Sequence, residues 1–258
     1  MPLSEPVPLR IPGLSRRLSL QLHDQRDLFV SRRIRDEGIW EPFETSLLLA
    51  SLSPGAVFVD VGANLGYFTV LAAHQVGETG RVFAFEPDPE NFSLLQGNLA
   101  LNGLEQRGEA VRAALSDEDG EGVLYLSEDN LGDHQIYSAG EVRDSIRIPL
   151  LRGGDYLRDR VERLDLLKVD TQGSEYRVMS GLMPLLRGLP MVPRILIELT
   201  PLSLQEAGSS GRALIELLAT LSQPFWIVDH IEHRLVASSE VELAQWCDNV
   251  DAVAGDRG

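Results

Sequence analysis

The stretch VFVDVGANLG, residues 57–66, decides the fold. It opens with VFVDV, whose apolar and β-branched side chains are typical of a buried strand. Gly62 and Gly66 follow, and the segment from Tyr67 to Val76 has the character of a helix. A strand that enters a glycine-containing turn and then a helix is the first unit of an open α/β sheet, and such a turn lets backbone amides approach a ligand.

Apolar runs alternate with amphipathic segments along the rest of the chain. The expected core strands are residues 57–61, 81–86, 110–115, 164–170 and 194–199, followed by 225–229 and an antiparallel partner at 233–237. Helices are expected near residues 25–36, 44–52, 67–76, 88–103, 174–186, 214–221 and 241–246. Because parallel strands require crossover helices, this order predicts an α/β protein: a Rossmann-like, doubly wound, mostly parallel sheet with an antiparallel last strand.

The chain divides into a lead-in, a main domain and a tail. Residues 1–55 carry short β-like stretches and helices, and they are a candidate lid for cofactor or substrate. Residues 56–250 form the predicted catalytic domain, and within it residues 127–148 are polar and aperiodic, as in a variable substrate segment. Residues 251–258 are expected to be a frayed tail.

Composition excludes several classes of protein. The 258 residues include 39 acidic and 23 basic side chains, a net charge of −16 that repels phosphate backbones and disfavours nucleic acid as a partner. The single cysteine, Cys247, excludes an intrachain disulfide and a cysteine-rich zinc site. No apolar run reaches the roughly 20 residues of a membrane span, and the proline- and arginine-containing N-terminus does not resemble a signal peptide. We therefore expect a soluble, cytoplasmic protein; nothing in the sequence indicates its oligomeric state.

Three polar residues at the strand ends indicate the cofactor. Asp60 lies at the end of the first core strand, and Asn64 stands where a dinucleotide-binding loop has a glycine. Glu86 ends the next strand, where a carboxylate accepts hydrogen bonds from ribose hydroxyls. An acid beside a glycine turn suits a nucleoside with a cationic amino group and no phosphate, and S-adenosylmethionine has both properties. Gly62 and Gly66 complete this expected cofactor site.

The adenine contact is expected in the loop after the third strand. Ser116 and Asp117 are candidates for a hydrogen bond with the adenine amino group. The segment SDEDG is equally typical of an ordinary turn.

Several motifs in this order resemble one family. The runs VFVDVGANLGYFTVLAA, FEPDPENFSLLQGNLALNG, AALSDEDG, LLKVDTQGSEYRVMSGL and ILIEL are similar to those of the FkbM family of methyltransferases, over roughly residues 38–200. The resemblance implies a class I methyltransferase fold and S-adenosylmethionine as the methyl donor. It also implies O-methylation of a hydroxyl on a sugar, glycolipid or polyketide-type small molecule. The upstream WEPFE resembles the family's lead-in, which makes Glu41 a candidate for closing the cofactor site; the alternative is an acid at a helix N-terminus.

Asp170 and His134 are the candidate catalytic residues. Asp170 ends the fourth core strand, where its carboxylate can orient the methionine amino group, accept the hydroxyl proton or bind a divalent metal. The family more often has an acid–glycine pair after this aspartate, and here Gln172-Gly173 replaces it, which weakens the case for a metal. His134, in the aperiodic segment, is the histidine best suited to act as a general base, although a polar surface role is equally plausible.

Four further residues are candidates for the acceptor side: Asp133, Tyr137, Gln172 and Glu198. Lys168 shares a strand face with Asp170 and needs a buried partner, for which Glu198 is the candidate. Glu175 has two interpretations, a compensating acceptor-side carboxylate or a first-turn acid that favours the helix dipole.

The sequence leaves other functions open. An N-methyltransferase acting on a small amine needs no strong base, and no feature excludes it. A nicotinamide-dependent oxidoreductase is disfavoured by the glycine spacing, and a non-catalytic binding protein by the intact loop with Glu86 and Asp170.

Overall fold

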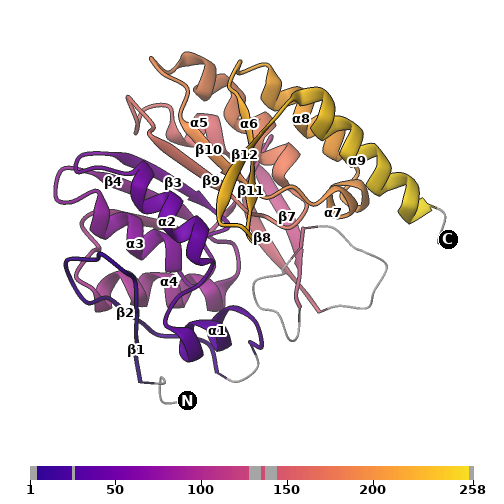
Figure 1. Ribbon diagram of the computed structural model, residues 1–258. Helices are drawn as coiled ribbons and strands as arrows, with labels where there is room; N and C mark the ends of the chain where they lie inside the picture. Colours follow the sequence, from indigo (N-terminus) through magenta and orange to yellow (C-terminus); the bar gives the residue numbers. More distant parts are fainter. Residues whose placement is uncertain (1–4, 25–26, 128–134, 137–143, 256–258) are drawn as a thin grey trace.

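The computed structural model describes residues 5–24, 27–127, 135–136 and 144–255 (Figure 1). At its centre is a five-stranded parallel sheet in the order β10-β9-β3-β4-β5. The strands are β3 (Val57–Val61), β4 (Arg81–Phe85), β5 (Gly108–Val111), β9 (Leu166–Val169) and β10 (Arg194–Ile197). The chain builds outward from β3 in one direction and later returns to its other side with β9, so the switch point lies between β3 and β9. In open α/β sheets, ligands bind at such a point, beyond the carboxyl ends of the strands.

Helices cover both faces of the sheet, as the predicted doubly wound fold requires. Phe58 packs in the core that includes α3 (Tyr67–Gln75) and α4 (Pro89–Leu101). Its neighbour Val59 packs in the opposite core with α6 (Glu175–Gly188) and α8 (Gly211–Ala219). Successive side chains of a strand point to opposite faces, so the apolar run of β3 supplies both cores.

The lead-in is packed against the main domain and shares its core. It contains β1 (Val7–Pro8), β2 (Ser19–Leu20), α1 (Val30–Glu37) and α2 (Pro42–Ser51). Leu20, Ile34 and Leu48 are fully buried in the core that also holds α3 and α4. Figure 1 shows these indigo segments lying along the α3 and α4 side of the sheet.

A small second sheet lies beyond β5, and here two predictions are wrong. The expected strand 110–115 is broken after Val111, where the Ala113 amide donates back to the Val111 carbonyl, and the chain then continues as β6 (Ala114–Ser116). β6 pairs with β8 (Ser145–Arg152), which in turn pairs with β7 (Gly120–Tyr125). The start of β8 lies inside the segment expected to be aperiodic, although its apolar residues Ile146, Ile148 and Leu150 alternate with polar or exposed ones.

The C-terminal strands do not extend the central sheet as expected. β11 (Phe225–Asp229) and β12 (Arg234–Ser238) form the expected antiparallel pair, but they make a separate two-stranded sheet. The loop of this hairpin instead contacts α2: His230 Nδ1 lies 2.5 Å from Glu44 Oε1, and the His233 ring stacks on Phe43. The last helix, α9 (Glu240–Gly255), continues past the expected start of the tail. Two further helices, α5 (Gly153–Leu157) and α7 (Pro201–Glu206), were not predicted.

Among the described residues, no helix has both the length and the apolar character needed to span a membrane.

Candidate active site

A cavity of about 290 Å³ opens at the carboxyl ends of β3, β4 and β9, at the switch point of the sheet. The lead-in contributes Phe29, Val30 and Trp40 to its wall. Its polar lining comes from the N-cap of α2, the β3–α3 loop, α4 and the ends of three strands, and includes Glu41, Asn64, Glu86, Asn91, Lys168, Asp170, Thr171, Gln172 and Glu198. Most of the residues expected at the strand ends therefore meet in one cavity.

The β3–α3 loop requires glycine for two separate reasons. Gly62 has φ +80°, and a Cβ atom there would lie 1.8 Å from the Asp170 carbonyl oxygen. Gly66 has φ +91° at the N-cap of α3, and its Cβ would lie 2.7 Å from Leu95 Cδ1. Both positions combine the left-handed backbone region with close packing, so a larger residue does not fit. Asn64 also has a positive φ, 51°, and its Oδ1 accepts from the Leu65 amide at 2.6 Å.

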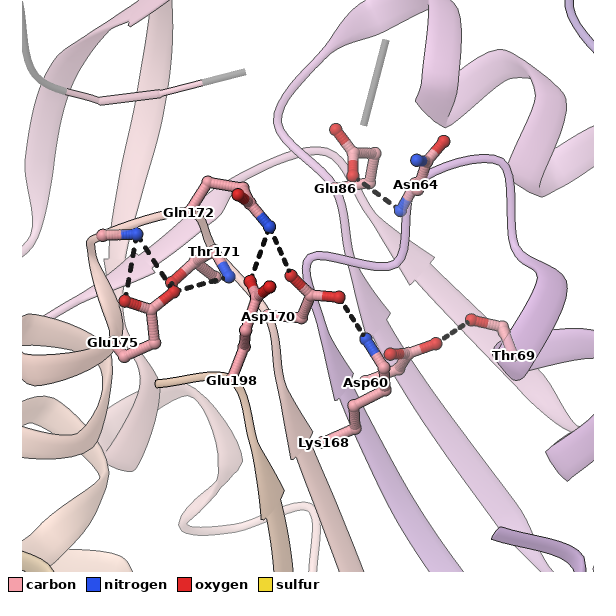
Figure 2. Close-up of polar contacts among 11 residues, drawn as sticks. Asp60, Asn64, Thr69, Glu86, Lys168, Asp170, Thr171, Gln172, Glu175 and Glu198 are labelled. Carbon is pink, nitrogen blue, oxygen red and sulfur yellow. Dashed lines mark hydrogen bonds and ion pairs between the residues drawn. The ribbon is translucent and has the colours of Figure 1, made fainter. Parts of the chain in front are cut away.

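Glu86 is a buried carboxyl group at the end of β4, 5% exposed. Its Oε2 accepts from the Asn64 amide at 2.8 Å (Figure 2). Its Oε1 accepts from the Asp88 amide at 2.9 Å. Burial, opposed by these backbone hydrogen bonds, raises the pKa of Glu86 to about 8. Two backbone donors thus orient the carboxyl group at the cavity wall, and the Asn91 side chain adds a further hydrogen bond to it.

Asp60 lies next to the cavity but does not line it. It is 1% exposed, its Oδ2 accepts from Thr69 Oγ1 at 2.6 Å, and its Oδ1 has no hydrogen-bond partner among the described residues. Burial raises its pKa, while the neighbouring Lys168 ammonium acts in the opposite direction. Because residues alternate along β3, Asp60 points to the α3 face, so its influence on a ligand is electrostatic.

Lys168 is the buried cation of the site. Its Nζ donates to Asp170 Oδ2 at 2.9 Å and lies 4.9 Å from the centre of the Phe68 ring. Burial lowers the pKa of Lys168, but the charges of Asp170 and Asp60 outweigh it and the net shift is upward. The prediction that Lys168 pairs with Glu198 is wrong. The ammonium instead forms an ion pair with Asp170, which lies two residues further along the chain on the same face.

Asp170, Gln172 and Glu198 form one hydrogen-bonded group. Gln172 Nε2 donates to Asp170 Oδ1 at 2.9 Å and to Glu198 Oε2 at 2.6 Å (Figure 2). Burial and the adjacent Asp170 charge raise the pKa of Glu198 to about 9. Burial acts in the same direction on Asp170, but the Lys168 ammonium and the hydrogen bonds lower the pKa of Asp170 overall. At neutral pH the group therefore holds an ionised Asp170 and a protonated Glu198.

Glu175 has a structural role in the loop after β9. Its Oε1 accepts from the Thr171 amide at 2.9 Å, and its Oε2 accepts from the Gly173 amide at 3.0 Å. The side chain is fully buried at the first residue of α6. These contacts support its interpretation as a first-turn acid that organises the backbone.

Glu41 enters the cavity from the N-terminus of α2. Its backbone has φ 41°, a left-handed conformation at the residue that precedes Pro42. Burial raises the pKa of Glu41 to about 7, while the Lys168 ammonium lowers it and the Asp170 carboxylate raises it. Glu41 therefore lies at the same end of the cavity as the Lys168–Asp170 pair.

Other expected site residues are placed elsewhere. Ser116 is buried and donates to Asp117 Oδ1 at 3.1 Å, and Asp117 lies 3.9 Å from Arg177. Neither residue lines the cavity; Ala114 and Leu115 occupy that part of the wall. His134, Asp133 and Tyr137 lie outside the described residues.

The lining fits a positively charged nucleoside. Among the described residues that line the cavity, four are acidic and only Lys168 is basic. The buried Asp60 carboxyl group, one oxygen of which has no hydrogen-bond partner among the described residues, interacts electrostatically with Lys168. S-adenosylmethionine carries an ammonium and a sulfonium against one carboxylate, and a net positive charge beside these acidic groups favours their ionised forms. In the described part of the chain, no three His, Cys, Asp or Glu side chains are grouped in a way that could hold a metal ion.

Comparison with known proteins identifies relatives of the main domain. Residues 60–224 match the family model "Methyltransferase FkbM domain". The methyltransferase sdnD of Sordaria araneosa is 29% identical over 163 residues, which cover 52% of this chain and 62% of that protein. The 31-O-demethyl-FK506 methyltransferase FkbM of Streptomyces tacrolimicus is 30% identical over 160 residues, covering 50% of this chain and 60% of that protein. The chain thus matches about three fifths of the length of these relatives.

Among solved structures, a SAM-dependent O-methyltransferase from Thermotoga maritima aligns with 93% of this chain and 89% of its own, at 15% identity and a TM-score of 0.42. A likeness this distant does not bear on the acceptor.

Proposed function

Because this chain belongs to the FkbM family of methyltransferases, with S-adenosylmethionine as its cofactor, we propose that it methylates a hydroxyl group of a sugar, glycolipid or polyketide-type small molecule. The observation that carries the proposal is that one cavity is lined by two sets of polar residues. Glu86 and the β3–α3 loop suit the nucleoside, and the Asp170–Gln172–Glu198 group suits a hydroxyl.

The residues that would hold the cofactor are those of β3, β4 and the loop between β3 and α3. Glu86 is the candidate for the ribose hydroxyls, with the Asn64 and Asp88 amides keeping its carboxyl group in place. When bound, S-adenosylmethionine supplies a methyl group made electrophilic by a positively charged sulfur.

The acceptor side is assigned to Asp170, Gln172 and Glu198. Asp170 is ionised, so it accepts a hydrogen bond from a hydroxyl and orients the oxygen. The same ion pair with Lys168 makes it a weak base. His134 stays a proposal as a catalytic base, with Asp133 and Tyr137 as neighbours on the acceptor side.

Oxygen is proposed as the methylated atom for two reasons. A hydroxyl must lose a proton on methylation, and this cavity is rich in carboxyl groups able to accept hydrogen bonds and protons. In addition, the name of the Streptomyces tacrolimicus relative, 31-O-demethyl-FK506 methyltransferase, specifies an oxygen.

Calorimetric binding tests the cofactor assignment. Wild-type protein should bind S-adenosylmethionine, and Glu86→Ala should weaken binding about 10- to 100-fold, the equivalent of losing charge-assisted hydrogen bonds of roughly 1.5–3 kcal/mol. Glu105→Ala, which removes an exposed carboxylate just beyond α4, is the matched control and should bind like the wild type. Equal affinity of the Glu86 variant and the control would contradict the role of Glu86.

Methyl transfer itself can be tested with S-adenosylmethionine labelled in the methyl group and a panel of hydroxyl and amine compounds. Label should appear in base-stable ether products, and Asp170→Asn should reduce the rate. Label found only on nitrogen would contradict the proposed acceptor.

A further inference from the structure

Glu41 differs from the other carboxyl groups at its end of the cavity in having no hydrogen-bond partner among the described residues. Asp170 is bound by Lys168 and Gln172, and Glu198 by Gln172. Glu44, on the next turn of α2, is in contact with His230. Among the described residues at this end, the Glu41 carboxyl group is therefore the one whose two oxygens accept no hydrogen bond from the protein.

The backbone holds Glu41 in the cavity at the expense of local strain. A φ of 41° is unusual for a residue with a side chain, and more so for one that precedes proline. The Thr45 amide donates to the Glu41 carbonyl at 2.8 Å, and Thr45 Oγ1 donates to the Trp40 carbonyl at 2.8 Å. The same hydroxyl lies 3.0 Å from the Tyr67 hydroxyl, so this turn is joined to the first residue of α3. Strain maintained by surrounding hydrogen bonds is common at functional sites.

The charges that face Glu41 come from four elements. They are Lys168 and Asp170 at the end of β9, Glu44 on α2, Arg33 on α1 and, when ionised, Tyr67 on α3. Burial is the largest influence, and it brings the pKa of Glu41 to about 7. At that value the carboxyl group gains or loses a proton near neutral pH when one nearby charge changes.

We propose that Glu41 is the general base of the methyl transfer. This inference depends on the function proposed above and names the residue that takes the acceptor's proton. As the new O–CH₃ bond forms, Glu41 accepts the hydroxyl proton, the S–CH₃ bond breaks, and sulfur keeps the electron pair of that bond. The products are the methyl ether, the neutral thioether and protonated Glu41.

Electrostatics favour this assignment because two opposite charges disappear in the same step. Before transfer, a cationic sulfonium in the cavity stabilises ionised Glu41. After transfer the sulfur is neutral, and burial again favours the protonated carboxyl group. Asp170 does not fit this role, because its negative charge is compensated by Lys168 both before and after the step.

The inference predicts a proton linkage that can be measured without the acceptor. S-adenosylmethionine, which is cationic at sulfur, should release a proton from Glu41 on binding, whereas the product S-adenosylhomocysteine should not. If the sulfonium lowers the pKa of Glu41 by one unit from about 7, then roughly 0.4 proton is released at pH 7. The preference for S-adenosylmethionine over S-adenosylhomocysteine should then increase about 9-fold between pH 5 and pH 9, because the ionised form binds the cation better.

The experiment is calorimetric titration of both ligands in buffers of different ionisation enthalpy, with wild type, Glu41→Gln and Glu105→Gln. Glu41→Gln should abolish the extra proton release and flatten the pH dependence of the ligand preference. Glu105→Gln, which removes an exposed carboxylate, should behave like the wild type. Glu86 and Glu198 also have raised pKa values, but they titrate in all three proteins, so the difference between variants isolates Glu41.

Three results would overturn the inference. The first is the same proton release in Glu41→Gln as in wild type, and the second is no difference in proton release between the two ligands in wild type. The third is an equal loss of affinity for both ligands in Glu41→Gln, which would mean that Glu41 holds the amino-acid part of the cofactor. Circular dichroism and thermal unfolding confirm that each variant is folded, and Glu41→Asp provides a second carboxylate variant that should retain the proton linkage. If wild type binds neither ligand, it is the proposed function that fails.

Discussion

At the scale of single residues, the burial of Glu86 links stability to pH. The folded state raises its pKa from 4.5 to about 8, so the folded protein binds a proton that the unfolded chain releases above pH 4.5. The stability from this protonated group is complete below pH 4.5 and is lost as pH rises towards 8.

We therefore expect the free energy of unfolding of the ligand-free protein to fall between pH 5 and pH 8, with a slope of up to about 1.4 kcal/mol per pH unit from Glu86. Glu86→Gln should reduce the slope. Some of the slope should remain in this variant, because the pKa of Glu198 is also raised on folding, to about 9, and its protonation contributes a slope of the same sign. Urea unfolding at several pH values measures the slope, and equal slopes in wild type and variant would contradict the assignment.

The same scale shows what strand-end reasoning can and cannot predict. Glu86, Asp170 and Glu198 line the cavity because each lies just past the end of a parallel strand, and the sequence pattern locates those ends. Asp60 is the last but one residue of β3, and the alternation that buries Val59 on one face directs Asp60 to the other. Ser116 lies outside the cavity for a different reason: the chain breaks after Val111, and Ser116 belongs to β6 of the second sheet.

At the scale of elements, the β3–α3 loop is defined by the close approach of two strand ends. Gly62 and Gly77 both have positive φ values, but only Gly62 lies against a backbone atom: its Cβ would be 1.8 Å from the Asp170 carbonyl oxygen, whereas that of Gly77 would be 3.9 Å from Pro54. Comparing substitutions at Gly62 and Gly77 therefore distinguishes the cost of a left-handed backbone from the cost of a steric clash.

Gly77→Ala should cost about 1–2 kcal/mol of stability, from the left-handed backbone alone. Gly62→Ala should cost about 3 kcal/mol or more, because the Asp170 carbonyl must also move. It should also weaken S-adenosylmethionine binding, since the displaced loop carries the Asn64 amide that orients Glu86. Denaturant unfolding and calorimetry measure both effects, and equal losses of stability in the two variants would exclude the steric contribution.

Element boundaries were predictable where the pattern was strong. The buried run of β3 and the strand β11 have the expected bounds, because apolar runs between turn residues define them clearly. β8 was missed because its alternation lies beside a polar segment and contains Pro149, which argues against a strand. The position of the β11–β12 hairpin was not predictable, since it depends on contacts with α2, far away in the sequence.

At the scale of the whole molecule, the lead-in completes the cavity that the sheet begins. The doubly wound order followed from the alternation of strands and helices. The resemblance of WEPFE to the family's lead-in pointed to Glu41 beside the cofactor, but no pattern in the sequence indicated that Val30 lines the same cavity as Glu86. That arrangement depends on tertiary contacts. Among them, Asn98 of α4 forms hydrogen bonds both with the lead-in and with the glycine loop.

Asn98 is fully buried and joins three segments. Its Oδ1 accepts from the Gln21 amide at 2.6 Å, and its Nδ2 donates to the carbonyls of Gln21 and Leu65, at 3.0 and 2.8 Å. Asn98→Ala leaves these backbone groups without partners, so we expect a loss of about 3 kcal/mol. Because the lead-in shares the core, unfolding of the Asn98→Ala variant should remain a single transition, at a lower denaturant concentration.

Limited proteolysis of this variant near Arg16 and Arg17 should also be faster. Gln96→Ala, an exposed change on the same helix, is the control and should leave both measurements unchanged. Two separate transitions in wild type would show instead that the lead-in folds independently, and that its contribution to the cavity is added to a domain already stable without it.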